Sequence, residues 1–189
     1  MRLKSEDAGL FYELFLPLLD YVNENYHLIA EPIKFAGESV DPRDAAEVAH
    51  FLWERTWIID DYLTGSDLPE ECQNILSSWK RCISGTFIIE RHLKKGSIFI
   101  STENDAVYLV NGIIDSWEEM FSGVPTPIIV KTTLLPFRDV IISDGLVSSF
   151  PIRFGRNSTA EFKESYMLAK TDKILYILGW INLYLYLNR

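Results

Sequence analysis

A short basic stretch holds the residues of this chain that are best placed to bind or react. It consists of Arg91, His92, Lys94 and Lys95. Phe87 and Phe99 stand on the apolar stretches before and after it. A basic turn beside aromatic strands is one way in which a small barrel binds single-stranded nucleic acid or another anionic ligand. A solvated hairpin tip has the same composition, so we predict the four basic residues as a ligand-binding site and leave its ligand open.

Carboxylates form two further clusters that could act as acid/base pairs or hold a divalent cation. They are Asp60 with Asp61, and Asp115 with Glu118 and Glu119. Neighbouring residues on a helix point about 100° apart, so Asp60 and Asp61 do not converge on one ion. A solvated turn beside Trp117 explains Glu118 and Glu119 better than a site does. We therefore predict neither cluster as a functional site.

Trp53 and Trp57 stand four residues apart, the spacing that places two side chains on one face of a helix. Such a pair could form the aromatic wall of a pocket. It also suits a hydrophobic core, and core packing is the interpretation that we prefer.

Sequence motifs of the common enzyme classes are missing. The chain has no Gly-rich phosphate loop, no Gly-x-Ser-x-Gly, no paired Cys-x-x-Cys and no His-Glu-x-x-His. His27, His50 and His92 do not stand at metal-ligand spacing from one another or from either cysteine. We therefore predict no catalytic residue, no metal and no cofactor.

The segment from Gly85 to Gly155 must position the basic stretch. Its short alternating apolar stretches, separated by turn residues, are typical of an antiparallel sheet or a partly open barrel. The turn before Gly96 predicts a hairpin, and the polar residues 102–105 predict the next turn of a meander. Asp144-Gly145 is a further turn signal. About five or six strands fit into this segment.

The N-terminal region is predicted to be helical. Apolar residues at three- and four-residue intervals indicate a helix starting near Ser5, which Pro17 should kink or divide. Asp41-Pro42 is a start signal for a second helix, with an expected continuation to Leu63. A third helix is expected to open at Asp67, with an acidic first turn.

The C-terminal region begins with a predicted helix capped by Ser158 or Thr159. The apolar segment 174–187 follows. It is shorter than the roughly 20 residues that span a bilayer, so we predict no membrane span. A buried helix or strand is the preferred interpretation of this segment, and an oligomerisation surface or a membrane-interface anchor is the alternative.

Charge is distributed unevenly along the 189 residues, whose net charge is −9. Residues 1–84 hold 7 Lys+Arg against 16 Asp+Glu, residues 85–156 hold 7 against 8, and residues 157–189 hold 4 against 3. An acidic helical region disfavours nucleic acid and anionic membranes as partners of that half. Glu6 and Asp7 precede any apolar run, unlike a signal peptide, and the cysteines lie too far apart on one predicted helix to form a disulfide; both observations favour the cytoplasm.

Several short stretches resemble an uncharacterised family of bacterial cytosolic proteins. They are Phe11-Tyr12-Glu13-Leu14, residues 18–23, residues 91–95, Leu134-Leu135-Pro136-Phe137 and Ser143-Asp144-Gly145-Leu146. The resemblance covers most of the chain up to about residue 170 and implies no assigned activity. Relatives can carry a zinc-binding SEC-C tail, but this chain has no such Cys/His cluster and ends in the apolar segment 174–187. Zinc binding is therefore not carried over.

The sequence predicts an α+β fold. An acidic helical subdomain (1–84) packs on a small antiparallel β module (85–156), and a C-terminal helix and apolar tail (157–189) complete one compact unit. The predicted function is a non-enzymatic module that binds or regulates a protein or peptide partner. Binding of single-stranded nucleic acid through the basic turn and a hydrolase using carboxylates with His92 are the alternatives, and homo-oligomerisation through the tail is a further option.

Overall fold

The computed structural model describes residues 1–29, 34–35 and 41–171. The chain divides between Cys82 and Ile83 into a helical unit, Lys4–Cys82, and a barrel unit formed by Met1–Leu3 with the chain from Ile83 onward. The predicted α+β class is confirmed, with helices before and after a mostly antiparallel sheet. The apolar segment 174–187 lies outside the described residues.

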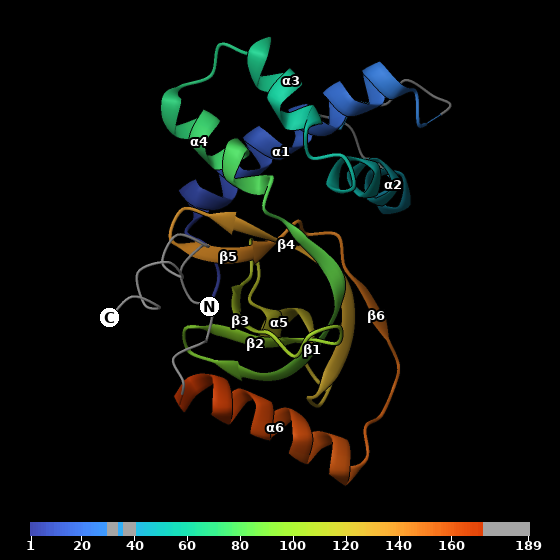
Figure 1. Ribbon diagram of the computed structural model, residues 1–189, viewed down its shortest axis with the longest axis vertical. Coiled ribbons are helices and arrows are strands. Elements are labelled where there is room, and N and C mark those ends of the chain that lie inside the picture. The colour runs from blue at the N-terminus through green and yellow to red at the C-terminus, as the bar shows by residue number, and fades with distance from the viewer. Residues whose placement is uncertain (30–33, 36–40, 172–189) are drawn as a thin grey trace. The chain divides into compact units, whose positions relative to one another are not determined.

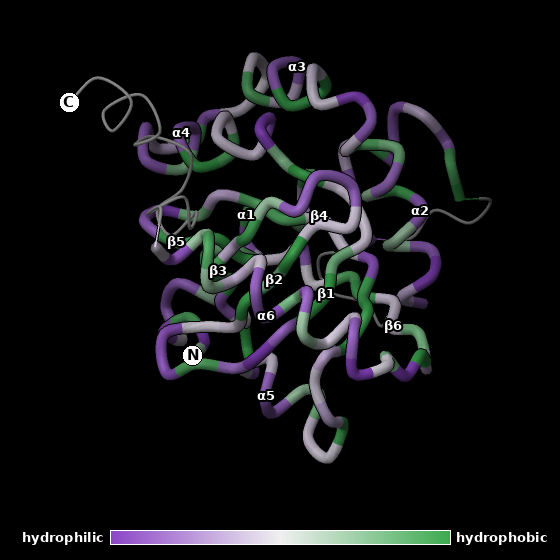
Figure 2. Tube along the Cα trace, turned by 60° about the horizontal axis from the view of Figure 1, so that its bottom comes forward, coloured by the Kyte–Doolittle hydropathy of each residue, from purple (hydrophilic) through white to green (hydrophobic). Residues whose placement is uncertain are grey.

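Four helices form the described part of the helical unit. They are α1 (Ser5–Tyr26), α2 (Pro42–Trp53), α3 (Ile58–Thr64) and α4 (Glu70–Trp79). The core contains an aromatic cluster in which Phe15 stacks on Trp53, with ring centroids 5.9 Å apart, and also meets Trp79 edge to face. Figure 2 shows hydrophobic and hydrophilic stretches alternating along the chain, the pattern that gives each element one face for the core.

Helix α1 runs unbroken through Pro17, so of the two alternatives that the sequence left open, a kink or a division, the division is wrong. Proline removes one backbone hydrogen bond, which costs stability. The apolar residues on both sides of it, Leu14, Phe15, Leu18 and Leu19, are all buried. Their burial offsets the lost bond and keeps the helix continuous.

The predicted start of α2 is confirmed, whereas its predicted continuation to Leu63 is wrong. Asp41 caps the helix by accepting a hydrogen bond from the Arg43 amide at 2.9 Å, and proline occupies the first turn. The helix ends at Trp53, and a turn leads into α3. The turn allows Ile58 and Ile59, both 0% exposed, to enter the core.

Five strands close into a barrel (Figure 1). They are β1 (Ile83–Leu93), β2 (Gly96–Ser101), β3 (Val107–Asn111), β4 (Ile128–Phe137) and β5 (Val140–Ser143). The order is β1-β2-β3-β5-β4, and the pairing of β4 with β1 closes the ring. All pairs are antiparallel except β3 with β5. The short strand β6 (Ser148–Phe150) pairs with β4 beside β5.

Side chains alternate between the inside and the outside of the barrel. The inside holds Phe87, Ile89, Phe99, Tyr108, Val110, Ile128, Val130, Leu134 and Ile141. Helix α5 (Trp117–Met120) adds Trp117 to this cluster. The outside of β1, β2 and β3 carries the aliphatic residues Ile88, Ile98, Ile100, Val107 and Leu109. Helix α6 (Arg156–Thr171) lies along the barrel, as Figure 1 shows, and Tyr166 of this helix packs against the outer face.

The first three residues belong to the barrel unit, which the sequence did not indicate. Arg2 forms a parallel bridge with Gly112, supported by hydrogen bonds from the Leu3 amide to the Gly112 carbonyl at 2.9 Å and from the Gly112 amide to Met1 at 3.1 Å. The first residues therefore pair with the chain directly after the end of β3.

No helix in the described part of the chain is both long and apolar enough to cross a membrane.

Candidate functional site

A β-bulge at Glu90 determines how the predicted basic site is arranged. Ile89 pairs with Phe99, but Arg91 pairs with Ile98, so β1 has one more residue than β2 at this point. Neighbouring residues of a regular strand point to opposite faces, and an extra residue disturbs that alternation. Here it places Glu90 and Arg91 on the same, outer face, where they form an ion pair.

Arg91 is engaged within the barrel unit. Its guanidinium donates to both carboxylate oxygens of Glu90, the longer of the two bonds being 2.7 Å. It also lies over the ring of Tyr166 on α6, 4.7 Å from the centroid. The hydrogen bond with Glu90 raises the pKa of Arg91, which therefore keeps its charge. This residue attaches α6 to the barrel and is not available as a free contact.

His92 faces the other way. It pairs with Ser97, whose hydroxyl lies 2.8 Å from its Nδ1 atom. Ser97 is only 2% exposed. Burial lowers the pKa of His92, and the carboxylate of Glu118 on α5 acts in the opposite direction. An imidazole and a buried hydroxyl are therefore in direct contact.

Lys94 and Lys95 form the turn between β1 and β2, and both are exposed. Neither has an ion-pair partner among residues 1–29, 34–35 and 41–171. The structure thus separates the four predicted residues: Arg91 on the outer face, His92 toward Ser97 and the lysines in solvent.

The aromatic residues beside the basic stretch are interior residues. Phe87 and Phe99 are both 0% exposed and pack against each other inside the barrel, with ring centroids 6.0 Å apart. They cannot stack on a base without opening the barrel. A nucleic-acid site built on these two rings has no support in this geometry.

Three of the five carboxylates in the two clusters, Asp60, Asp115 and Glu119, have structural partners. Asp60 pairs with Lys80 at 2.5 Å, and Asp115 lies 3.7 Å from Arg2. Glu119 completes a capping box with Ser116. The hydrogen bonds from Ser116 lower the pKa of the Glu119 carboxyl group. Within the described ranges no group of three or more His, Cys, Asp or Glu residues could hold a metal ion.

Trp53 and Trp57 lie in different environments. Trp53 is 7% exposed in the core of the helical unit, whereas Trp57 is 52% exposed. Core packing is therefore correct for Trp53 only. The helix in which four-residue spacing would align them ends at Trp53.

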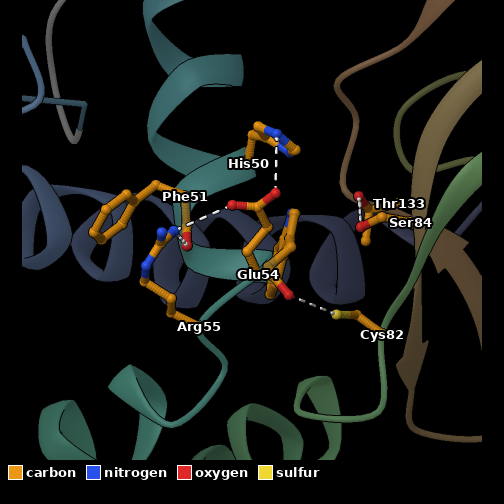
Figure 3. A network of polar contacts seen from close by, with 8 residues as sticks. His50, Phe51, Glu54, Arg55, Cys82, Ser84 and Thr133 are labelled. Carbon is orange, nitrogen blue, oxygen red and sulfur yellow. Dashed lines mark hydrogen bonds and ion pairs between the residues drawn. The ribbon is translucent and has the colours of Figure 1, made fainter.

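Figure 3 shows polar contacts around Glu54 at the end of α2 and between the strands β1 and β4. His50 and Arg55 both approach the carboxylate of Glu54, at 3.4 and 3.2 Å, and Arg55 also lies over the Phe51 ring. Exposed pairs of this kind contribute little stability. The hydroxyls of Ser84 and Thr133, 2.8 Å apart, join β1 to β4.

Sequence reasoning missed the partners that determine the state of each basic residue. No sequence motif includes Glu90, Ser97 or Tyr166. Their roles depend on the β-bulge, on the strand register and on where α6 packs against the barrel. An acidic residue directly before Arg91 was the one local signal.

The described elements define a class of protein, an acidic helical unit joined to a closed five-stranded barrel with a helix on its outer face. No family model, curated protein or solved structure matches the chain. The family resemblance therefore stays a prediction.

Proposed function

We propose that this protein is a non-enzymatic module that binds a protein or peptide partner, with Lys94 and Lys95 among its contacts. The observation that carries the proposal is the contrast within the basic stretch. Arg91 and His92 are used by the barrel unit itself, whereas the two lysines project into solvent without an ion-pair partner in the described chain. Exposed, unpaired charges at a hairpin tip suit recognition of an acidic partner surface.

The strand order supports a binding role by analogy. Small Greek-key barrels of the oligonucleotide- and oligosaccharide-binding type use the outer face of their second and third strands. Here the corresponding face is covered by α6, and its side chains are aliphatic. Bases need aromatic or planar side chains for stacking. The geometry therefore favours a protein partner over single-stranded nucleic acid, although fold analogy alone assigns no function.

The test is quantitative binding to a partner identified by cross-linking in the native cell. We expect Lys94→Ser with Lys95→Ser to weaken that complex about tenfold, the effect of losing rim charges that steer and orient a partner. Lys131→Ser, a change of an exposed lysine on β4, is the matched control. An unchanged affinity of the double variant for every partner would remove the lysines from the proposed site.

A nucleic-acid partner has its own signature. Anisotropy with a fluorescent single-stranded oligonucleotide at low and at moderate salt distinguishes it, because phosphate contacts give steeply salt-dependent binding. We expect no binding at either salt concentration.

A hydrolase is the second candidate, and the geometry around His92 favours it. The imidazole contacts the Ser97 hydroxyl at 2.8 Å, and these are the residue types of a base and a nucleophile. The burial of Ser97 opposes this reading, since a nucleophile must reach its substrate. Hydrolysis of simple esters that Ser97→Ala and His92→Gln both abolish would establish the enzyme and displace the binding module.

A further inference from the structure

Helix α6 presents a basic stripe to solvent. The stripe consists of Arg156, Ala160, Lys163, Met167 and Lys170. Its spacings are four, three, four and three residues, which keep all five side chains on one side of a helix. Each of the five residues is exposed.

The stripe is separate from the face that holds α6 on the barrel. Tyr166 is buried there, with Phe162 and Ala169 partly buried beside it. At 100° per residue the stripe lies next to this face, on one side of it. Its residues are therefore not needed to attach the helix.

Charge along the stripe is of one sign. Arg156, Lys163 and Lys170 have no ion-pair partner in the parts of the chain that the structure describes. Of the acidic residues of α6, Glu161 falls on the opposite side of the helix, about 140° from the centre of the stripe, whereas Glu164 lies at the edge of the stripe, about 80° from its centre. Met167, 46% exposed, adds an apolar contact between two of the cations.

The attached face of α6, and not the stripe, lies beside the strand that leads to Lys94 and Lys95. Arg91 lies over Tyr166, and Leu93 packs into the same outer cluster as Ala169. The turn that begins at Lys94 therefore follows directly from the strand end beside the C-terminal half of α6.

We propose that this stripe docks an acidic amphipathic helix of a partner protein. Three cations seven residues apart, about 10.5 Å per step along the axis, match carboxylates that recur at the same interval on a second helix. An apolar residue flanking those carboxylates would meet Met167. This inference rests on the proposed binding function and specifies the chemistry of the partner.

Two other partners, a second copy of α6 and nucleic acid, match the stripe less well than an acidic helix does. A second copy of α6 would place like charges against each other, which is unfavourable. Nucleic acid would meet exposed cations but no exposed aromatic ring on the stripe. An acidic helix satisfies both the charges and the spacing.

The probe is the acetylated and amidated peptide (Glu-Ala-Ala-Glu-Leu-Ala-Ala)₃, in which Glu repeats at the same three- and four-residue spacing. A scrambled peptide of equal composition spreads its Glu residues around the helix. By calorimetry at low salt, we expect the full-length protein to bind the patterned peptide about tenfold more tightly than the scrambled one. Equal binding of both peptides, or no binding of either, would overturn the inference.

Charge reversal then tests the surface itself. Arg156→Glu with Lys163→Glu and Lys170→Glu should weaken the patterned peptide about tenfold or more, because three exposed ion pairs become repulsive. A peptide with Lys in place of Glu should bind this variant and not the wild type. Glu161→Lys, a reversal on the opposite side of α6, should not weaken the Glu peptide. Circular dichroism verifies that each variant is folded.

Three further results separate this inference from the proposed function. If the identified partner depends on Lys94 and Lys95 but not on the stripe, the proposed function stands and the acidic-helix inference is wrong. If sedimentation shows self-association of the protein that the stripe reversal abolishes, the occupant is a second copy. If a single-stranded oligonucleotide binds the stripe more tightly than the peptide, the partner class is wrong.

Discussion

The guanidinium of Arg91 lies 4.7 Å from the centre of the Tyr166 ring and thereby links the bulged end of β1 to α6. Glu90 fixes the orientation of that guanidinium from the same face of the strand. Cation–π contacts of this kind contribute about 0.5–1 kcal/mol or more when partly buried. A residue that the sequence offers as a free contact thus holds a helix in place.

Truncation of Tyr166 should loosen α6. The ring is 6% exposed among the aliphatic residues of β1, β2 and β3, so Tyr166→Ala should destabilise the barrel unit by about 3 kcal/mol. Hydrogen exchange of the α6 amides, which reports local opening, should accelerate. Tyr166→Phe keeps the ring and is the control. Exchange at α6 that Tyr166→Ala leaves unchanged would contradict this attachment.

Substitution of Gly96 should be far more costly than substitution of Gly123. Both glycines have a positive φ, 145° and 82°, which L side chains rarely adopt. A Cβ at Gly96 would also stand 2.7 Å from the Asn111 side chain and 2.9 Å from the Val110 carbonyl, whereas a Cβ at Gly123 meets nothing within 4 Å.

We therefore expect Gly123→Ala to cost about 1 kcal/mol, the backbone contribution alone. Gly96→Ala should cost about 1–3 kcal/mol more, the effect of overpacking. Urea unfolding of the two variants measures the difference. Equal losses of stability in the two variants would mean that β3 shifts near Asn111 at little cost and makes room for the added Cβ.

Acid should destabilise the protein in part through His92. Burial lowers the pKa of this imidazole below its ordinary value of 6.5. Between the folded-state pKa and 6.5, the unfolded chain therefore binds more protons at this residue than the folded chain does. The stabilisation contributed by neutral His92 is complete above about pH 6.5 and is lost as the pH falls through the folded-state pKa.

Comparison with His92→Gln isolates this effect. The free energy of unfolding should fall less between pH 7.5 and pH 5 in the variant than in the wild type, because glutamine does not titrate. Urea unfolding at the two pH values gives the change in the free energy of unfolding for each protein. An equal fall of the free energy of unfolding in the two proteins would show that groups other than His92 account for the whole pH dependence of stability.

The two tryptophans of the helical unit should respond in opposite ways to truncation. Trp53 stacks on Phe15 at an interplanar angle of 2°, so Trp53→Ala should cost about 3–5 kcal/mol. Trp57 is 52% exposed, and Trp57→Ala should change stability by less than about 0.5 kcal/mol. Thermal unfolding with tryptophan fluorescence compares the two variants. A large loss at Trp57 would indicate a contact beyond the described residues.

Much of the fold follows from local signals in the sequence. Period-two alternation around Gly96 and Asp144-Gly145 predicted the meander and the later turn, because each strand must alternate between the inside and the outside of the barrel. The Asp41-Pro42 cap predicted the start of α2 for an equally local reason. Pro17 does not divide α1, because burial of the apolar residues on both sides of it offsets one lost hydrogen bond.

The sequence by itself determined the class of the fold, the order of its elements and the exposure of Lys94 and Lys95, since these depend on patterns within a few residues. Only the tertiary structure decided that β4 returns to β1 and closes the barrel, that the Glu90 bulge turns Arg91 toward Tyr166, and that His92 meets Ser97. These relationships join residues through strand register and helix packing. A single extra residue in a strand changes which face a side chain takes, so no local pattern can specify them.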